Sequence, residues 1–329
     1  MVPRIDVPAS ATEQQWYYTR AELARPPSVR EGSMSLEEER RRRQQGIRAI
    51  WTLRDALGLT QLVVTVAATL FQRYYMRESF TTHDHLTAAG AAVFLACKVE
   101  EQPKSSKLIT HVLFEIRRGK VRGRWPGPNP PIPETSRPGF DDMRRKLTIV
   151  EEAMLNALCF DMTVRDPHYL IVLAAEKIWR EDKEAREKLV GAAWSFLNDT
   201  LSAPLCILHP PPLLAAAALA LACIQLSHPL PAVPPSLDEQ RAQHADAAEE
   251  GEEAPEFEPE VFWLEMLGVE EGELKEAVQD ICEVYTAAED DFVVKQGALL
   301  AEEARTALLA FPFPVTSNPP VEDSATSAS

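Results

Sequence analysis

An internal repeat with a spacing of 126 residues is the feature that most constrains the fold of this 329-residue chain. Under that shift VFLACK, which ends at Lys98, overlays the end of ALALACI, and Cys97 falls on Cys223. Residues 67–73 (AATLFQR) likewise overlay residues 193–199 (AWSFLND), so small, hydroxyl and bulky apolar positions keep the same order. Because chance rarely gives two such windows in register, the chain is predicted to contain two copies of one fold.

Both copies are predicted to be helical. Hydrophobic residues make up 45% of the chain and aromatic residues 7%, and the apolar residues gather in Ala- and Leu-rich stretches. Ser35 and Glu38 have the spacing of a capping box, Thr60 is placed to cap the next helix, and Gly58 marks the end between them. The expected helices are 35–57, 62–76, 84–98, 103–117 and 140–158 in the first copy, and 166–180, 185–202, 210–226, 258–267 and 271–288 in the second.

The third helix of each copy is dominated by alanine, as AAGAAVFLA and LLAAAALALA. Small side chains allow neighbouring helices to approach its backbone on every side, so each is predicted to be the buried hub of a bundle. The expected fold class is therefore all-α, with two tandem five-helix bundles.

The chain divides into four predicted parts. Residues 1–34 form an N-terminal arm with a short docking helix over Thr12–Leu23, and residues 35–162 and 163–290 form the two bundles. Residues 291–329 lack apolar periodicity and are expected to be disordered. The Pro- and Gly-rich stretch 118–139 is interpreted as a surface loop, with nuclear import or an acidic partner as the alternative for its basic residues. Residues 227–260 form an acidic, proline-containing linker.

Charge, cysteine content and the lack of targeting segments argue against a nucleic-acid-binding, secreted or membrane-spanning protein. The net charge is −16, yet ten acids against one arginine lie in Ser236–Glu260 alone, so much of the excess belongs to the linker. Direct nucleic-acid binding is not expected, because no long basic stripe is present. The five cysteines are widely spaced in apolar stretches and suit small core residues in a reducing compartment. The opening residues lack a secretion signal, and the apolar run Leu213–Leu226 is too short for a membrane span.

No catalytic motif was found in the sequence. It contains no Gly-rich phosphate loop, nucleophile elbow or HExxH. His83 and His85 have no further ligand at metal-binding spacing, and neighbouring acids such as Glu100 and Glu101 point about 100° apart on a helix. A non-catalytic protein without metal or cofactor is therefore expected.

Lys98 is the unusual position of the first hub helix, because the repeat has Ile224 there. One interpretation is a lysine that interacts favourably with the helix C-terminus. The other is a lysine held by a carboxylate of the fifth helix, so that the two present a fixed donor and acceptor to another protein. The residues alone leave both open.

Several strings resemble the cyclin family. FLACKVEEQPKSSKLI (94–109) and EEAMLNALCFDM (151–162) are similar to the third-to-fourth and fifth helices of the cyclin box. WYYTRAELARPPS (16–28), FQRYYMRESF (71–80) and AWSFLNDTLSAPL (193–205) look like cyclins K and T and the beta subunits of fungal CTD kinases. The resemblance covers about residues 12–290, with gaps at the two insertions.

The resemblance implies a nuclear regulatory subunit that binds and activates a cyclin-dependent kinase, one that phosphorylates the RNA polymerase II C-terminal domain. It leaves open which kinase and whether a third subunit joins. By their match to the family, the implied kinase-binding residues are Lys98, Val99, Glu101, Glu151, Leu155 and Phe160.

Three alternatives remain beside this interpretation. Residues 47–51 (IRAIW) faintly resemble a substrate-docking patch, although the apolar spacing there also suits the core. A DNA-binding adaptor of the transcription factor IIB type uses the same tandem fold, but its CxxC zinc-ribbon pair is missing. A helical scaffold without a kinase would leave the motifs at Lys98 and Glu151 unexplained.

Overall fold

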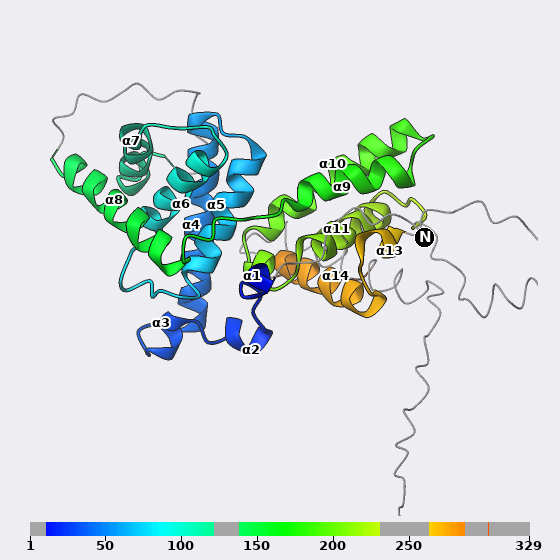
Figure 1. The fold of residues 1–329 in the computed structure, drawn as a ribbon, viewed down its shortest axis with the longest axis horizontal. Coiled ribbons are helices and arrows are strands. Elements are labelled where there is room, and N and C mark those ends of the chain that lie inside the picture. Colours follow the sequence, from blue (N-terminus) through cyan, green and yellow to red (C-terminus); the bar gives the residue numbers. More distant parts are fainter. Residues whose placement is uncertain (1–10, 122–137, 231–262, 287–301, 303–329) are drawn as a thin grey trace, which may run out of the picture.

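The computed structural model describes residues 11–121, 138–230 and 263–286, together with residue 302. Within these residues every regular element is a helix, and the helices form two bundles that lie side by side (Figure 1). The first bundle consists of α4 (Leu36–Leu57), α5 (Gln61–Tyr74), α6 (His85–Val99), α7 (Ser106–Arg117) and α8 (Phe140–Ala157). The second consists of α9 (Pro167–Ile178), α10 (Lys183–Thr200), α11 (Pro211–Gln225), α13 (Trp263–Leu267) and α14 (Glu271–Thr286), with a 3-10 turn at Pro204–Ile207. The predicted fold class is confirmed.

The internal repeat is visible in the helix bounds. A shift of 126 residues moves the bounds of α6 onto those of α11, and it moves the end of α5 at Tyr74 onto the end of α10 at Thr200. The repeat found in the sequence therefore reports two copies of one helical unit.

The two hub helices also end in the same turn. After α6, Glu101 has a φ of 52°, and the backbone N–H of Gln102 donates to the carbonyl of Cys97 at 2.8 Å. After α11, Ser227 has a φ of 51°, and the equivalent bond, from the residue that follows it, is again 2.8 Å long. A left-handed residue with a bond spanning six residues is the Schellman termination of a helix.

Each hub helix is surrounded by its own bundle. Helix α6 packs against α4, α5, α7 and α8, and α11 packs against α9, α10, α13 and α14. Ten of the fifteen residues of α6 and thirteen of the fifteen of α11 are buried, and alanine is the most frequent residue among them. At Gly90 a Cβ atom would lie 2.3 Å from Cδ1 of Leu113, so any larger residue there would require this side chain of α7 to shift. The predicted hub role of both helices is confirmed.

Most helices start near the predicted residues, but the capping hydrogen bonds differ from those predicted. Ser35 accepts the N–H of Glu38 at 3.1 Å, but the Glu38 carboxylate pairs with Arg42 at 2.8 Å and leaves the expected capping box half formed. Thr60 does precede α5, but its hydroxyl accepts the side-chain amide of Gln102 at 2.8 Å and does not cap the helix. Helix α7 starts three residues later than predicted, at Ser106.

The N-terminal segment differs from the prediction. In place of one helix over Thr12–Leu23, it forms α1 (Ala11–Gln14) and α2 (Arg20–Leu23), followed by α3 (Pro27–Arg30). Thr19 causes the break, because its hydroxyl accepts the N–H of Glu22 while the Glu22 carboxylate accepts the N–H of Thr19. This complete capping box starts a new helix.

The same segment ties the two bundles together. The buried Trp16 donates its indole N–H to Asp161 at 2.8 Å, in the link between the bundles. The Tyr18 N–H donates to the carbonyl of Ile207 at 2.8 Å, in the second bundle. The segment therefore fixes how the bundles sit against each other.

Asp280 of α14 is a buried, charged anchor of this segment. Its carboxylate accepts the guanidinium of Arg20, at 2.8 Å for one of the two bonds, and the imidazole of His209 at 2.5 Å. Burial by itself raises the pKa of Asp280, but the bonds from His209 and Arg20 outweigh it and leave this pKa below its usual range. The carboxylate thus stays charged and holds α2 to the second bundle.

Some predictions fall on parts that are not described. Most of the 118–139 loop, most of the 227–260 linker and nearly all of the 291–329 tail lie outside the described residues. The boundaries of the four predicted parts stay predictions. None of the described helices is both long enough and apolar enough to cross a membrane.

Gly46 of α4 provides a test of the packing between α4 and α5. A Cβ atom there would lie 2.1 Å from Cζ of Phe71, so Gly46→Ala is expected to lower the free energy of unfolding by about 1–3 kcal/mol. Gly191→Ala in the exposed face of α10 meets no atom within 4 Å and should raise it by about 0.5–1 kcal/mol. Urea denaturation of both variants checks this, and effects of the same sign would contradict the packing.

Candidate functional site

An ion pair joins the Lys98 ammonium, in the last turn of α6, to the Glu151 carboxylate of α8. The Lys98 side chain is 50% exposed and that of Glu151 only 10%. A carboxylate presented to another protein, as one interpretation of the sequence held, would be expected at the surface, but Glu151 is buried. Glu151 lies four residues after Leu147 and three before Met154, so it shares the helical face that packs into the core.

The burial of Glu151 makes its partner important. A carboxylate taken out of water is destabilising unless a cation compensates it, and removing one member of such a pair leaves an uncompensated charge. Lys98 supplies that charge while keeping half of its own surface in solvent. The site is therefore a buried acceptor covered by an accessible cation.

Phe94 is a member of this site that the sequence interpretation missed. The Lys98 Nζ atom lies 4.1 Å from the centroid of the Phe94 ring, one helical turn earlier on α6. A cation over an aromatic face is attracted by the ring quadrupole. The signal was the spacing of four residues between an aromatic residue and a lysine on a predicted helix.

Val99 and Glu101 follow the lysine at the end of α6. The Val99 side chain is 41% exposed although it is apolar, and Glu101 is exposed in the left-handed turn. Glu100 lies between Val99 and Glu101, and its pKa is raised by burial and by the nearby Asp166 carboxylate. The turn thus presents an apolar side chain and an acid directly beside Lys98.

Leu155 and Phe160 lie at the end of α8. Leu155 is partly buried against the core, one turn after Glu151. The N–H of Phe160 donates to the carbonyl of Leu155 at 2.9 Å, and both Cys159 and Phe160 have positive φ values, 52° and 59°. The Phe160 side chain is 67% exposed. Cys159 is exposed too, so the expectation of five core cysteines is wrong at this position.

The faint docking-patch resemblance at residues 47–51 is explained by the core. Ile47 and Ile50 are 2% and 0% exposed, and Trp51 lies against the Arg54 guanidinium at 5.2 Å. The apolar spacing therefore serves packing, as the alternative interpretation held.

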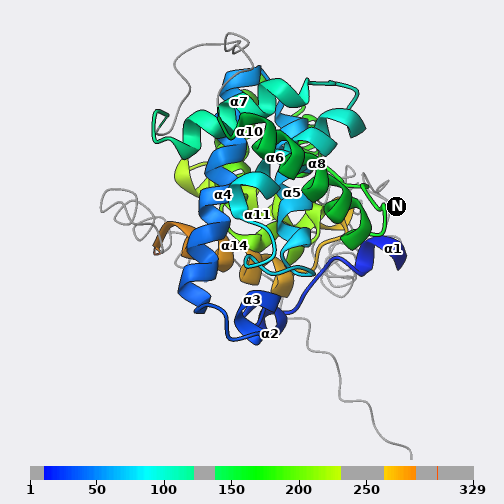
Figure 2. The same cartoon turned by 90° about the vertical axis from the view of Figure 1, so that its left-hand side faces the viewer.

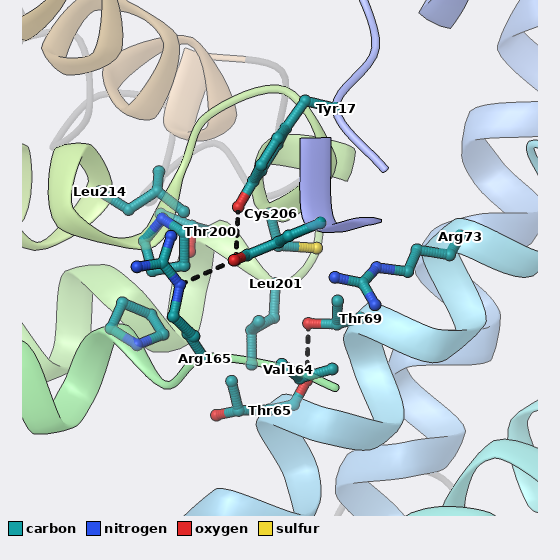
Figure 3. A pocket seen from close by; sticks show the side chains of 13 residues that line it. Tyr17, Thr65, Thr69, Arg73, Val164, Arg165, Thr200, Leu201, Cys206 and Leu214 are labelled. Atoms are coloured by element: carbon teal, nitrogen blue, oxygen red, sulfur yellow. Dashed lines mark hydrogen bonds and ion pairs between the residues drawn. The ribbon is translucent and has the colours of Figure 1, made fainter. Parts of the chain in front are cut away.

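A small hollow lies between the N-terminal segment and the two bundles (Figure 3). Glu13 accepts the Tyr17 hydroxyl at 3.1 Å and Nε of Arg165 at 2.8 Å, and the buried Arg73 donates to the carbonyl of Thr163 at 2.9 Å. Burial raises the pKa of the Cys206 thiol to about 11, so it stays neutral. These groups hold three segments together, and they include no activated nucleophile.

Comparison with known proteins places the paired residues in a family. The sequence model of the cyclin N-terminal domain matches residues 13–163, a span that contains α4 to α8 and the Lys98–Glu151 pair. Residues 13–163, which hold the first bundle, belong to the cyclin family. Members of this family are non-catalytic regulatory subunits of protein kinases.

Its relatives include the cyclins K and T. Over 211 residues it is 29% identical to human cyclin-K, covering 64% of this chain and 34% of the relative. Over 210 residues it is 31% identical to cyclin-T1 of Mus musculus, covering 64% and 27%. Cyclin pch1 of Schizosaccharomyces pombe is 28% identical over 243 residues, covering 73% and 67%. The chain thus spans about a third of the length of human cyclin-K and about a quarter of that of the Mus musculus cyclin-T1.

Solved structures share the cyclin fold. The yeast RNA polymerase II CTD kinase CTDK-1 complex contains a chain that matches with a TM-score of 0.61 at 16% identity, covering 93% of this chain and 91% of that one. The CAK complex of Chaetomium thermophilum bound to ATP-gamma-S matches with a TM-score of 0.56 at 15% identity, covering 91% and 87%. At these identities the likeness establishes the fold.

The turn after α6 yields a test at Glu101. A non-glycine residue in the left-handed region is strained, so Glu101→Gly is expected to raise the free energy of unfolding by about 0.5–1 kcal/mol. Glu100→Gly is the control, because its φ of −91° suits any residue and glycine there only adds flexibility to the unfolded chain. Chemical denaturation distinguishes them, and a loss of stability at position 101 would contradict the strained turn.

Proposed function

We propose that this cyclin binds and activates a cyclin-dependent protein kinase. The observation that carries the proposal is the Lys98–Glu151 pair with its accessible lysine. Each of the two helices that supply the pair ends near an exposed apolar side chain, Val99 for α6 and Phe160 for α8. The fold it shares with chains of kinase complexes supports a kinase as the partner.

The pair suits recognition of a polypeptide backbone. A lysine ammonium has three N–H donors, so Lys98 keeps donors free while one bonds to Glu151. The Glu151 carboxylate has further acceptor positions. In this proposal they bond to the main chain that leads into the kinase C-helix, as the family resemblance implies. Charge-assisted bonds of this kind are about twice as strong as neutral ones.

The apolar residues around the pair would strengthen those bonds. Val99 and Phe160 are exposed, and Leu155, one turn after Glu151, is half-buried. In protein interfaces a central polar contact gains strength when surrounding apolar groups exclude water. Glu101 would lie at the edge of this interface, where its charge remains solvated.

Activation of the kinase would need no chemistry from this chain. A protein kinase is active when its C-helix glutamate pairs with the lysine that positions ATP and when its activation loop is ordered. A subunit that binds only this state shifts the kinase population toward it by the difference in affinity.

The proposed substrate is the C-terminal domain of RNA polymerase II, during transcription elongation in the nucleus. Support comes from the cyclin-K and cyclin-T1 relatives and from the fold shared with the yeast RNA polymerase II CTD kinase complex. Because the chain spans only part of cyclins K and T1, no function of their remaining length is inferred.

A double substitution tests the site. Lys98→Ala/Glu151→Ala is expected to weaken kinase binding by about 30-fold or more, since loss of a central hot spot costs about 2 kcal/mol or more. The cyclin is purified with its kinase from the native source, the kinase is identified by mass spectrometry, and its affinity is measured with recombinant subunits. Phosphorylation of a polymerase C-terminal-domain peptide by the complex tests the substrate.

Two controls accompany this test. Lys107→Ala removes an exposed lysine from the nearby helix α7 and should leave binding unchanged. The double variant removes both charges and should melt close to the wild type, whereas Lys98→Ala alone leaves Glu151 uncompensated and should be less stable. Recovery of no kinase would favour a scaffold or an adaptor of the transcription factor IIB type. Unchanged binding by the double variant would exclude this site.

A further inference from the structure

A groove between α2 and α3 is lined by residues that are distant in sequence from the Lys98–Glu151 pair. It has a volume of about 460 Å³, and its lining includes Tyr18, Arg25, Pro27, Arg30 and Met76. Helices α2 and α3 lie together at the lower end of the first bundle in both views (Figures 1 and 2). The volume lies in the range of sites that bind small molecules or short peptide segments.

Two arginines in this groove lack partners among the described residues. Arg25 and Arg30 are exposed, and the side chain of neither makes a hydrogen bond or an ion pair within that part of the chain. Arg20, by contrast, is bonded to Asp280. The acid in the groove, Glu22, is bonded to the backbone and hydroxyl of Thr19. With two arginines against one glutamate, the groove carries a net positive charge in a chain whose net charge is −16.

The walls of the groove are held in place before any ligand binds. Helix α2 is fastened to the second bundle through Arg20 and Asp280. Helix α3 is fastened to the first bundle, because the buried Ser28 hydroxyl accepts the N–H of Phe80 at 2.9 Å. The prolines at 26 and 27 restrict the backbone between them. A preorganised site loses less entropy on binding than a flexible one.

We propose that this groove binds a phosphorylated peptide segment of a partner protein. A phosphoryl group carries a charge of about −1.5 to −2 at neutral pH, which matches two arginines. The guanidinium group bonds to phosphate through two parallel N–H donors. Pro27, Met76 and the Tyr18 ring supply apolar surface for the residues that flank the phosphate. That surface favours a peptide over free phosphate, and kinase binding is not needed for this inference.

Fluorescence anisotropy on the 329-residue chain without a kinase tests the proposal. The probe is a labelled degenerate peptide library with a fixed central phosphoserine, compared with the matching serine library. The phosphoserine library is expected to bind at least about tenfold more tightly, because only it offers a dianion to the two arginines. Arg25→Gln/Arg30→Gln should abolish this difference.

The control is Arg48→Gln/Arg145→Gln, which removes the same charge from two exposed arginines outside the groove. This variant should keep the preference for phosphoserine, and circular dichroism should show all variants folded. Equal binding of the two libraries, or equal effects of the two double variants, would overturn the proposal. So would inorganic phosphate binding as tightly as the phosphopeptides.

One further outcome concerns the acidic segment of the chain itself. If phosphopeptides bind only after Glu249, Glu250, Glu252 and Glu253 are changed to Gln, that segment occupies the groove, and a partner segment is excluded. A loss of kinase binding in the experiment on Lys98 and Glu151 leaves all of these measurements unaffected, so the two proposals fail separately.

Discussion

Close packing around the two hub helices is the constraint on which the rest of the structure depends. Helices α6 and α11 are each contacted by four neighbours, and alanine and glycine let the backbones approach. At Gly90 even a methyl group would collide with Leu113. A helix enclosed in this way can carry charge only where it leaves the bundle, which explains why Lys98 lies in the last turn of α6.

The second bundle shows what the fold alone requires at that site. Ile224 occupies the position of Lys98, with the same turn after it. The core residues Leu147, Val150 and Met154 of α8 correspond to Leu274, Ala277 and Ile281 of α14, 127 residues further on. On that register Glu151 corresponds to the buried Val278. An apolar pair therefore satisfies the same architecture, so the ion pair of the first bundle is not a requirement of the fold.

Much of the fold could be predicted from the sequence because its signals are local or periodic. The repeat, the alanine-rich hubs and most helix starts follow from spacing alone. The break at Thr19 was missed because a capping box competes with the continuous helix that apolar spacing suggests. The burial of Glu151 was missed because it depends on how α8 faces α6, a contact 53 residues apart in the chain. The sequence did not indicate the groove residues Arg25 and Arg30, because residue spacing does not show whether an arginine side chain will find a partner in the folded chain.

The unequal exposure of the two charges bears on how the site would work. A free lysine side chain loses about 1.5–2 kcal/mol of rotamer entropy when it is fixed in an interface. Lys98 is already restrained, because it bonds to a carboxylate that burial holds in place and lies over the Phe94 ring. Part of that entropy is thus lost on folding and not on binding. If both side chains were fully solvated, the same charges would contribute less to affinity, so the buried Glu151 strengthens the case for a recognition site.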